Sequence, residues 1–206
     1  FFGDAPCFKG KKILTYAASA GSVDTLKEID KVQLKGWLSK FSSLSVREKS
    51  LSHYLSEDLQ LENQLVIDPV LLAGKEVYQE IATSHKPKKN YLLFFSLWKN
   101  DEALHIAREK AISEELELIE MYGMTEVVKN KKVMQCLSPD EFVGLFQEAT
   151  YVVSTSFHGT VFSILFHKPF LCFGFNFGKS RFHSLLNMFG LEYRLVDIND
   201  IANYVE

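Results

Sequence analysis

The residues with the clearest potential for chemistry lie in one short segment, which reads YVVSTSFHG from Tyr151 to Gly159. An apolar run typical of a buried strand leads into a turn rich in Ser and Thr, and His158 then begins a helical pattern. In open α/β sheets, ligands bind outside the carboxyl ends of the strands. A helix that starts there presents N–H groups that attract anions. The segment therefore predicts an anion-binding turn.

Each residue of this turn has its own expected role. The hydroxyls of Thr155 and Ser156 could cap the helix or hydrogen-bond to a phosphate. Gly159 would let a ligand approach the backbone closely. His158, whose charge changes near neutral pH, could donate a proton at a bound anion. A plain helix cap that carries a structural histidine is the alternative interpretation of the same residues.

A second candidate for binding an anion is Arg47, which follows a short predicted strand at residues 43–46 in the motif SVRE. The planar guanidinium group suits carboxylate and phosphate groups. The alternative is an arginine that pairs with Glu48 or with Asp68. Asp68 precedes a proline, so it could also serve only to turn the chain.

A third candidate is the loop GFNFGKSR at residues 174–181, which carries Asn176, Lys179 and Arg181. Two glycines and several polar side chains are typical of a loop that closes on a substrate. A plain surface loop has the same composition, and this alternative stays open.

Other kinds of active site lack their signatures. A nucleophile elbow, G-x-S-x-G, would need glycine where Ser154 and His158 stand, so we do not expect a serine hydrolase. The sequence has no P-loop, no dinucleotide-binding G-x-G-x-x-G and no H-E-x-x-H or paired histidine spacing for zinc. We therefore expect neither a metal nor a resident cofactor.

Charge and cysteine content narrow the class of protein further. The 206 residues include 23 Lys and Arg and 26 Asp and Glu, for a net charge of −3, which argues against nucleic acid as a partner. Apolar residues make up 47%, which is typical of a globular chain. The cysteines, Cys7, Cys136 and Cys172, are far apart and favour a reducing compartment, so we expect a cytoplasmic protein.

No membrane span or secretory signal is expected. The longest stretch without an acidic or basic residue runs from Ala149 to His167, but its central Ser, Thr and His residues would be costly in hydrocarbon. The beginning, FFGDAPCFKGKK, has its charges after the apolar patch, unlike a signal peptide, and it lacks an initiator Met. We expect a fragment of a longer protein.

Strands and helices are predicted to alternate, which favours parallel βαβ units and an α/β fold. Strands are predicted at 12–17, 43–46, 65–67, 91–97, 126–128, 151–154 and 169–173, and helices at 24–40, 48–55, 101–121, 158–167 and 181–189. Short helical turns are predicted at 70–85, and a capping box formed by Ser138 and Glu141 starts another helix. The charged, proline-containing segment 86–90 is the expected linker, so we predict domains at 1–85 and 86–206; a solvated loop inside one domain is the alternative.

Five segments in this order resemble the polysaccharide pyruvyl transferase family over nearly the whole chain. They are KKILTYAASAG, SLSVREKS, VIDPVLLAG, VVSTSFHGTVFSILFHKPF and RFHSLLNMFGLEYR. The resemblance implies an α/β fold of two Rossmann-like lobes with parallel sheets, similar to GT-B glycosyltransferases. Family members are longer, so residues 1–85 are expected to be an incomplete N-terminal lobe and residues 86–206 the C-terminal lobe.

The resemblance also implies an activity in exopolysaccharide biosynthesis. Phosphoenolpyruvate would be the donor substrate, and its enolpyruvyl group would pass to two hydroxyls of a sugar or glycan-lipid acceptor to form a pyruvate ketal. Arg47 matches an arginine that holds the donor's anionic groups, and His158 matches the histidine taken as the general acid. Ser156 stands where the best-studied members carry arginine, so Arg181 or Lys179 could supply that cation instead.

Two other functions stay open at this point. A related GT-B-like enzyme would use a nucleotide sugar, and it would bind a uridine nucleotide more tightly than phosphoenolpyruvate. A glycan-binding module without catalysis would show no change in any measurable property after His158→Ala. For the pyruvyl transferase, we expect a cleft between the two lobes to hold the doubly anionic donor.

Overall fold

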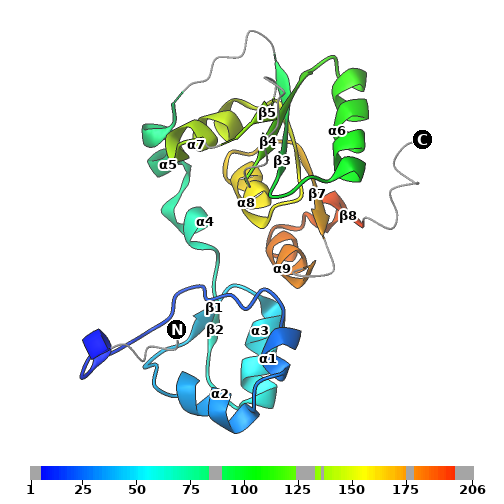
Figure 1. The fold of residues 1–206 in the computed structure, drawn as a ribbon. Helices are drawn as coiled ribbons and strands as arrows, with labels where there is room; N and C mark the ends of the chain where they lie inside the picture. The colour runs from blue at the N-terminus through cyan, green and yellow to red at the C-terminus, as the bar shows by residue number, and fades with distance from the viewer. Residues whose placement is uncertain (1–5, 84–89, 124–132, 136, 175–178, 198–206) are drawn as a thin grey trace. The chain divides into compact units, whose positions relative to one another are not determined.

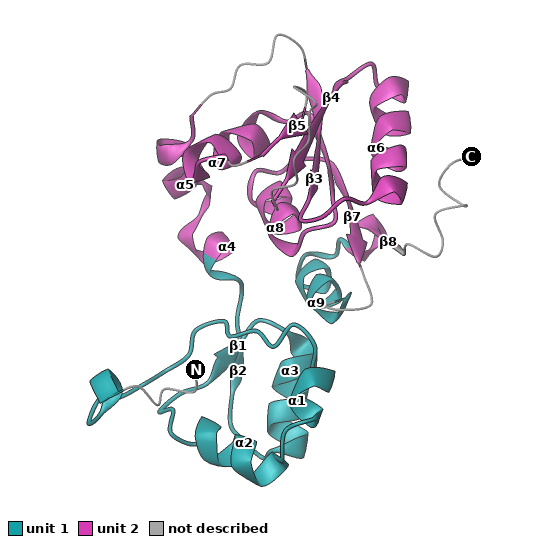
Figure 2. Ribbon diagram, in the orientation of Figure 1, with its two compact units in different colours: residues 1–69, 176–191 teal, residues 70–175, 192–206 magenta. Residues whose placement is uncertain are grey.

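The fold is described by a computed structural model that covers residues 6–83, 90–123, 133–135, 137–174 and 179–197 (Figure 1). The chain divides into two compact units, coloured separately in Figure 2. Unit 1 comprises residues 1–69 and 176–191, and unit 2 comprises residues 70–175 and 192–206. Residues 70–83 thus pack with unit 2. The domain boundary expected at residue 85 falls outside the described residues and stays a prediction.

Unit 2 is built around a parallel sheet. Its strands are β3 (Tyr91–Ser96), β4 (Glu117–Tyr122), β5 (Val133–Met134), β6 (Tyr151–Ser154), β7 (Phe170–Gly174) and β8 (Leu195–Asp197). They lie in the order β5-β4-β3-β6-β7-β8, and each neighbouring pair is parallel. From β3 the chain first fills one side of the sheet and then, from β6, the other. This is the doubly wound arrangement, whose topological switch point lies between β3 and β6.

Helices cover both faces of this sheet (Figure 1). On one face, α6 (Asp101–Ser113) buries Leu104 and Ala107 against Phe94 and Val153. The opposite face carries α5 (Lys75–Ile81), α7 (Pro139–Glu148) and α8 (Phe157–Leu165), whose aromatic side chains pack edge to face. The predicted capping box is present at the start of α7, where Glu141 Oε2 accepts hydrogen bonds from the N–H and hydroxyl of Ser138 at 2.9 Å.

One predicted helix of unit 2 is wrong. The helix expected at 101–121 ends at Ser113, and β4 occupies residues 117–122. Glu115 takes a left-handed conformation with φ 54°, which breaks the helix, and side-chain burial then alternates, with Ile119 and Met121 buried. The regularly spaced glutamates of this stretch imitate the polar face of a helix. The strand β8 and the 3-10 turn η3 (Glu192–Arg194) were not expected, and the strand predicted at 126–128 lies outside the described residues.

Unit 1 has a small parallel sheet formed by β1 (Ser45–Val46) and β2 (Gln64–Leu65). Residues 12–17, expected to be a strand, make only isolated bridges, Leu14 to Ser43 and, just beyond the range, Ala18 to Val46. The other elements are η1 (Pro6–Phe8), α1 (Asp24–Lys27), α2 (Lys31–Leu38), α3 (Lys49–His53), the π-helical turn η2 (Tyr54–Asp58) and α4 (Pro69–Ala73), which runs on into unit 2. The helix predicted at 24–40 is divided because the Asp30 side chain caps α2 by accepting from the Gln33 N–H at 2.9 Å.

A later segment of the chain completes unit 1. Helix α9 (Lys179–Phe189) packs against α3, and the backbone N–H of Lys49 donates to Ser184 Oγ at 2.9 Å. Figure 2 colours α9 with unit 1 for this reason. The predicted helix at 181–189 is therefore confirmed, but it belongs to the same unit as the SVRE motif.

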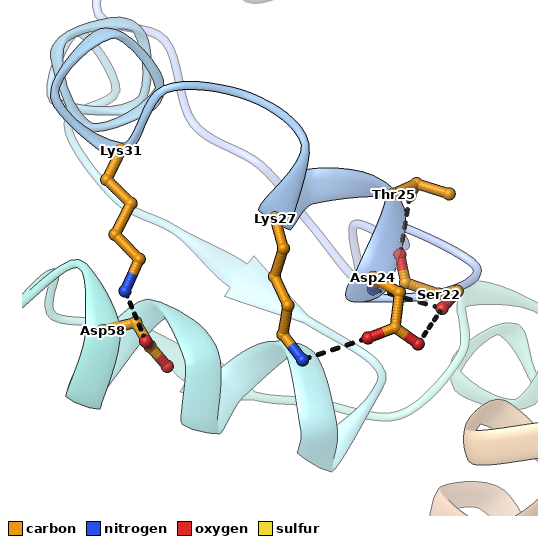
Figure 3. Close-up of polar contacts among 6 residues, drawn as sticks. All are labelled: Ser22, Asp24, Thr25, Lys27, Lys31 and Asp58. Atoms are coloured by element: carbon orange, nitrogen blue, oxygen red, sulfur yellow. Dashed lines mark hydrogen bonds and ion pairs between the residues drawn. The ribbon is translucent and has the colours of Figure 1, made fainter.

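Residues of α1 and α2 in unit 1 form exposed ion pairs (Figure 3). Lys27 Nζ lies 3.0 Å from Asp24 Oδ1, and Lys31 Nζ lies 2.7 Å from Asp58 Oδ1. The hydrogen bond from Lys31 lowers the pKa of Asp58, and the one from Lys27 lowers the pKa of Asp24. All four side chains face water, so these pairs add little to stability.

Candidate functional site

The turn that carries His158 lies at the topological switch point of unit 2. Strands β3 and β6 are parallel neighbours, and their carboxyl ends are at Ser96 and Ser154. The chain then turns through Thr155 and Ser156 into α8. The connections that follow β3 and β6 run in opposite directions along the sheet. Doubly wound folds bind their ligands at the carboxyl ends of two such strands. The expected placement of the turn at the carboxyl end of a strand agrees with this topology.

A network of hydroxyls joins the ends of the two strands. The Thr155 and Ser96 hydroxyl oxygens lie 2.6 Å apart, and the Ser96 hydroxyl donates to the Trp98 carbonyl. Thr155 therefore acts as the donor to Ser96. Ser154 adds a second connection, because its hydroxyl donates to the Phe95 carbonyl at 3.0 Å and accepts from the Ser156 N–H at 3.0 Å. These buried bonds fix the backbone just before α8.

The two predicted phosphate-binding hydroxyls differ in what they do here. The Thr155 hydroxyl donates its hydrogen bond to the Ser96 hydroxyl. Ser156 is the N-cap residue of α8 and is buried, yet within the described residues its side chain makes no capping hydrogen bond. Its carbonyl accepts the N–H of Thr160 at 3.0 Å and starts the helix. Capping by the Ser156 hydroxyl, one of the two roles expected from the sequence, is therefore not observed.

His158 is exposed in the first turn of α8. Its ring meets that of Phe157 edge to face, with centroids 5.5 Å apart and an angle of 84°. The first N–H groups of a helix lack intrahelical partners and carry a partial positive charge, so an anion beside this ring is favoured. An exposed imidazole at such a position can exchange a proton with a bound ligand.

Gly159 is required for packing. A Cβ at this position would lie 2.1 Å from Ser154 Oγ and 2.8 Å from Phe95 Cδ1. Only glycine therefore lets α8 approach β3 and β6 this closely. The missing side chain makes room for Ser154 and Phe95, and this packing accounts for the glycine without the ligand contact that the sequence suggested.

A cavity of about 260 Å³ opens at the carboxyl ends of β3 and β4. It is lined by Phe95, Met121, Tyr122, Gly123, Leu137, Pro139 and Phe142. Burial, followed by the nearby charge of Glu120, raises the pKa of Tyr122 to about 12. The sequence did not predict this cavity because its walls come from three separate segments, Phe95, residues 121–123 and residues 137–142, which no local pattern links.

Arg47 follows β1 in unit 1 and makes the ion pairs that the sequence left as an alternative. Its Nη1 lies 2.5 Å from Asp68 Oδ2, and its Nε lies 3.8 Å from Glu48 Oε1. The Arg47 side chain is 15% exposed, whereas those of Asp68 and Glu48 are 2% and 3% exposed. Asp68 thus does more than turn the chain, because it fixes one edge of the Arg47 guanidinium.

The predicted cations of the loop at 174–181 lie in the first turn of α9. Arg181 is half-buried, and burial lowers its pKa, which the negative charge of Glu48 raises and the positive charge of Arg47 lowers. Arg181 and Arg47 both belong to unit 1, in which α9 packs against α3. Lys179 is also half-buried in this turn, and Asn176 lies outside the described residues.

The predicted residues that the structure describes thus fall into two groups, one in each unit. Thr155, Ser156, His158 and Gly159 lie together in unit 2, and Arg47, Lys179 and Arg181 lie in unit 1. Among the residues that the structure describes, no group of three or more His, Cys, Asp or Glu side chains could hold a metal ion. In the same residues, no helix is long and apolar enough to cross a membrane.

Comparison with solved structures supports the fold class. A putative UDP-N-acetylglucosamine 2-epimerase from Listeria monocytogenes matches 93% of this chain with a TM-score of 0.51 and 11% identity. A glycotransferase of kitacinnamycin matches 86% of the chain (TM-score 0.45, 13% identity), and the wall teichoic acid polymerase TagF matches 85% (TM-score 0.42, 10% identity). The chain spans 62%, 52% and 48% of their respective lengths. With the parallel sheets, the likeness to the epimerase confirms the expected α/β, GT-B-like fold class.

Comparison at the level of sequence gives the family. No curated protein matches the chain. A family model described as polysaccharide pyruvyl transferase, however, matches residues 1–176, which include both the SVRE motif and the STSFHG turn. The chain therefore belongs to the polysaccharide pyruvyl transferase family.

Proposed function

We propose that this protein transfers the enolpyruvyl group of phosphoenolpyruvate onto two hydroxyls of a sugar in a polysaccharide or its glycan-lipid precursor. The product is a cyclic pyruvate ketal. The observation that carries the proposal is the exposed His158 at the start of α8, at the switch point of a doubly wound sheet in a chain of this family. The widely separated cysteines support a cytoplasmic reaction.

In this proposal, His158 is the general acid. The charged imidazole gives a proton to the methylene carbon of the donor, and positive charge develops at the neighbouring carbon. A sugar hydroxyl attacks that carbon and phosphate leaves; a second hydroxyl then closes the ketal. Of the two protons released by the hydroxyls, one restores the imidazolium and the other leaves with the phosphate. General acid catalysis of this kind contributes about 10²–10⁴ in rate.

Binding of the donor needs positive charge, because phosphoenolpyruvate carries a carboxylate and a phosphate. The N-terminus of α8 supports binding of one such group beside His158. Arg47 supports binding of another, since Asp68 holds one edge of its guanidinium and the side chain keeps some exposure. We assign Arg47 to the donor on this basis and on its place in the SVRE motif.

Titration of phosphoenolpyruvate by calorimetry tests this function. We expect the protein to bind it and Arg47→Ala to weaken binding at least tenfold. Arg108 is the matched control, because it is an exposed arginine on α6 that pairs with Glu120, and Arg108→Ala should leave the affinity unchanged. Uridine diphosphate serves as the competing ligand. Undetectable binding of phosphoenolpyruvate, or tighter binding of the nucleotide, would overturn the proposal.

A further inference from the structure

The loop that follows β3 carries a large exposed side chain at the topological switch point of unit 2. Trp98 lies two residues beyond the end of β3 and is 63% exposed. This loop leads to α6 on one face of the sheet, whereas the turn with His158 leads to α8 on the other face (Figure 1). In doubly wound folds, the ligand lies between two connections that diverge in this way. Trp98 and His158 therefore lie on opposite sides of the place where a ligand is expected.

Three contacts hold the loop of Trp98 in place. At its beginning, the buried Ser96 hydroxyl donates to the Trp98 carbonyl. Leu97 lies close to Gly123, where an added Cβ would be 2.8 Å from Leu97 Cδ2. At the end of the loop, the Asn100 side chain caps α6 by accepting from a backbone N–H of its first turn at 2.7 Å. The backbone that carries the indole is thus fixed, which lowers the conformational entropy lost when a ligand binds.

Ser96 also connects this loop to the turn of His158. Its hydroxyl accepts the hydrogen bond of the Thr155 hydroxyl, with the two oxygens 2.6 Å apart, while it donates to the Trp98 carbonyl. Thr155 begins the turn that reaches His158 three residues later. One buried side chain therefore fixes the backbone on both sides of the switch point. A ligand that contacts Trp98 would meet the turn of His158 in a constant geometry.

The chemistry of the loop fits an uncharged ring. An indole offers a flat apolar face and one N–H donor at its edge. The next residue, Lys99, pairs with Asp101, whose Oδ1 lies 3.1 Å from Lys99 Nζ, so the charges of the loop offset each other. A pyranose ring presents C–H groups on its faces and hydroxyls around its edge, and it therefore matches the indole. An anion would instead favour the N-terminus of α8.

We propose that Trp98 is a stacking platform for a sugar ring of the acceptor. This inference rests on the proposed function, because it names the residue that holds the acceptor while the donor binds at the start of α8. A sugar hydroxyl can attack the donor only if its ring lies beside the donor. A platform on the β3 side of the switch point, across from the turn of His158, meets this requirement.

NMR of the indole N–H groups tests the platform. The chain has two tryptophans, Trp37 in unit 1 and Trp98 in unit 2, and Trp37→Phe assigns their signals. The probes are methyl glucopyranoside, methyl galactopyranoside and methyl mannopyranoside, titrated into the protein without phosphoenolpyruvate. We expect at least one of them to shift the Trp98 signal and to leave the Trp37 signal unchanged. Absence of a Trp98 shift with all three would overturn the inference.

Substitutions at Trp98 separate stacking from simple apolar contact. Saturation-transfer NMR observes the bound hexoside and gives its Kd for every variant. We expect Trp98→Ala and Trp98→Leu to raise the Kd about tenfold, and Trp98→Tyr only about threefold, since tyrosine keeps an aromatic face. The Tm should stay constant, because Trp98 is exposed. A Kd that is unchanged by Trp98→Ala, or preserved by Trp98→Leu, would overturn the inference.

Tyr193→Ala is the matched control. Tyr193 is an exposed aromatic residue of unit 2 as well, at 65%, but it precedes β8 and so lies at the amino ends of the strands. Its replacement should leave the Kd of the hexoside unchanged.

A membrane surface is the other occupant that an exposed tryptophan suggests. Vesicles of phosphatidylcholine and phosphatidylglycerol would then shift the fluorescence of Trp98 to shorter wavelength in the Trp37→Phe protein. We expect no such shift. A shift with vesicles and no response to the hexosides would overturn the inference.

A parallel titration with phosphoenolpyruvate separates the two proposals. If a hexoside binds through Trp98 but phosphoenolpyruvate does not bind, the sugar site stands and the proposed function fails. If phosphoenolpyruvate binds and depends on Arg47, but no hexoside binding depends on Trp98, the proposed function stands and this inference fails.

Discussion

The hydroxyl oxygens of Ser96 and Thr155 lie 2.6 Å apart, although 59 positions separate the two residues in the sequence. The bond joins the end of β3 to the first residue after β6, directly at the topological switch point. The Ser96 hydroxyl donates its own hydrogen bond to the Trp98 carbonyl, so Thr155 is the donor between the two hydroxyls. The backbone that leads to His158 is therefore held by side chains from two strands.

Removing the Ser96 hydroxyl should destabilise unit 2 more than removing the Thr155 hydroxyl. Ser96→Ala leaves the buried Thr155 hydroxyl without its acceptor and should cost about 2 kcal/mol in the free energy of unfolding. Thr155→Val removes the donor in an isosteric way and should cost about 1 kcal/mol. Ser113→Ala, at an exposed helix end, is the control and should change little. Urea denaturation measures all three, and equal losses for the first two variants would contradict the assigned donor.

In the proposed reaction, His158→Ala should lower kcat for ketal formation by about 10²–10⁴, because it removes the proposed general acid. The Tm should change little, since the side chain is exposed. His105→Ala, at an exposed position on α6, is the control. Phosphate release in the presence of acceptor measures the rate. An unchanged rate would favour a non-catalytic role for the turn.

Gly159→Ala should destabilise the protein by about 3 kcal/mol, because the new methyl group would overlap Ser154 and Phe95. Gly36→Ala is the matched comparison, since Gly36 lies inside α2 with no atom within 4 Å of its added methyl group. That change should stabilise the protein by about 0.5–1 kcal/mol through helix propensity. Thermal unfolding measures both, and similar values for the two glycines would contradict the packing role of Gly159.

Asp68→Asn should destabilise unit 1, because it leaves the guanidinium of Arg47 without its closest charge. We expect a loss of about 2 kcal/mol, below the range for fully buried pairs, since Arg47 keeps some contact with water. Asp58→Asn is the control: it breaks the exposed pair with Lys31 shown in Figure 3 and should have no measurable effect. Chemical denaturation monitored by circular dichroism distinguishes the two, and equal stabilities would show that burial does not strengthen the Arg47 pair.

Cys172 should make the protein less stable in alkali. Burial raises the pKa of its thiol to about 12, from an ordinary value of 9.0, although a hydrogen bond with Thr160 opposes the shift. The unfolded chain then releases a proton between pH 9 and 12 that the folded chain keeps. This contribution to stability is complete below pH 9 and is lost as the pH rises to 12.

The slope of the unfolding free energy against pH between pH 9 and 12 measures the contribution of the Cys172 thiol. Cys172→Ala should reduce it by up to about 1.4 kcal/mol per pH unit. Cys7→Ala, which changes an exposed thiol, should leave the slope as it was. Urea titrations at several pH values provide the data, and an identical slope without Cys172 would show that this thiol does not contribute.

Much of the fold could be predicted from the sequence where a single pattern dominates. The continuous apolar run of β3 and the strand–turn–helix of residues 151–165 are as expected. The prediction failed at β4, because its glutamates are spaced as on the polar face of a helix although side-chain burial alternates as in a strand. It also failed at residues 12–17, which form only isolated bridges. In each case tertiary pairing decides the conformation of a segment whose local pattern is ambiguous.

The candidate site could be predicted only in part. Arg47 and His158 stand in recognisable motifs, but nothing near Ser96 in the sequence indicates its bond to Thr155. The role of Gly159 also depends on Phe95, a side chain from another strand. Such relationships arise from the order of the strands, which local periodicity does not encode.

Because α9 belongs to unit 1, this unit is assembled from two stretches of chain with the β3–β7 part of unit 2 synthesised in between. A ribosome must therefore deliver residue 191 before unit 1 can be completed, and α3 has no α9 to pack against until then. Unit 2 likewise waits for β8 at its edge. The segments that complete the two units, α9 and β8, are therefore synthesised within a few residues of each other.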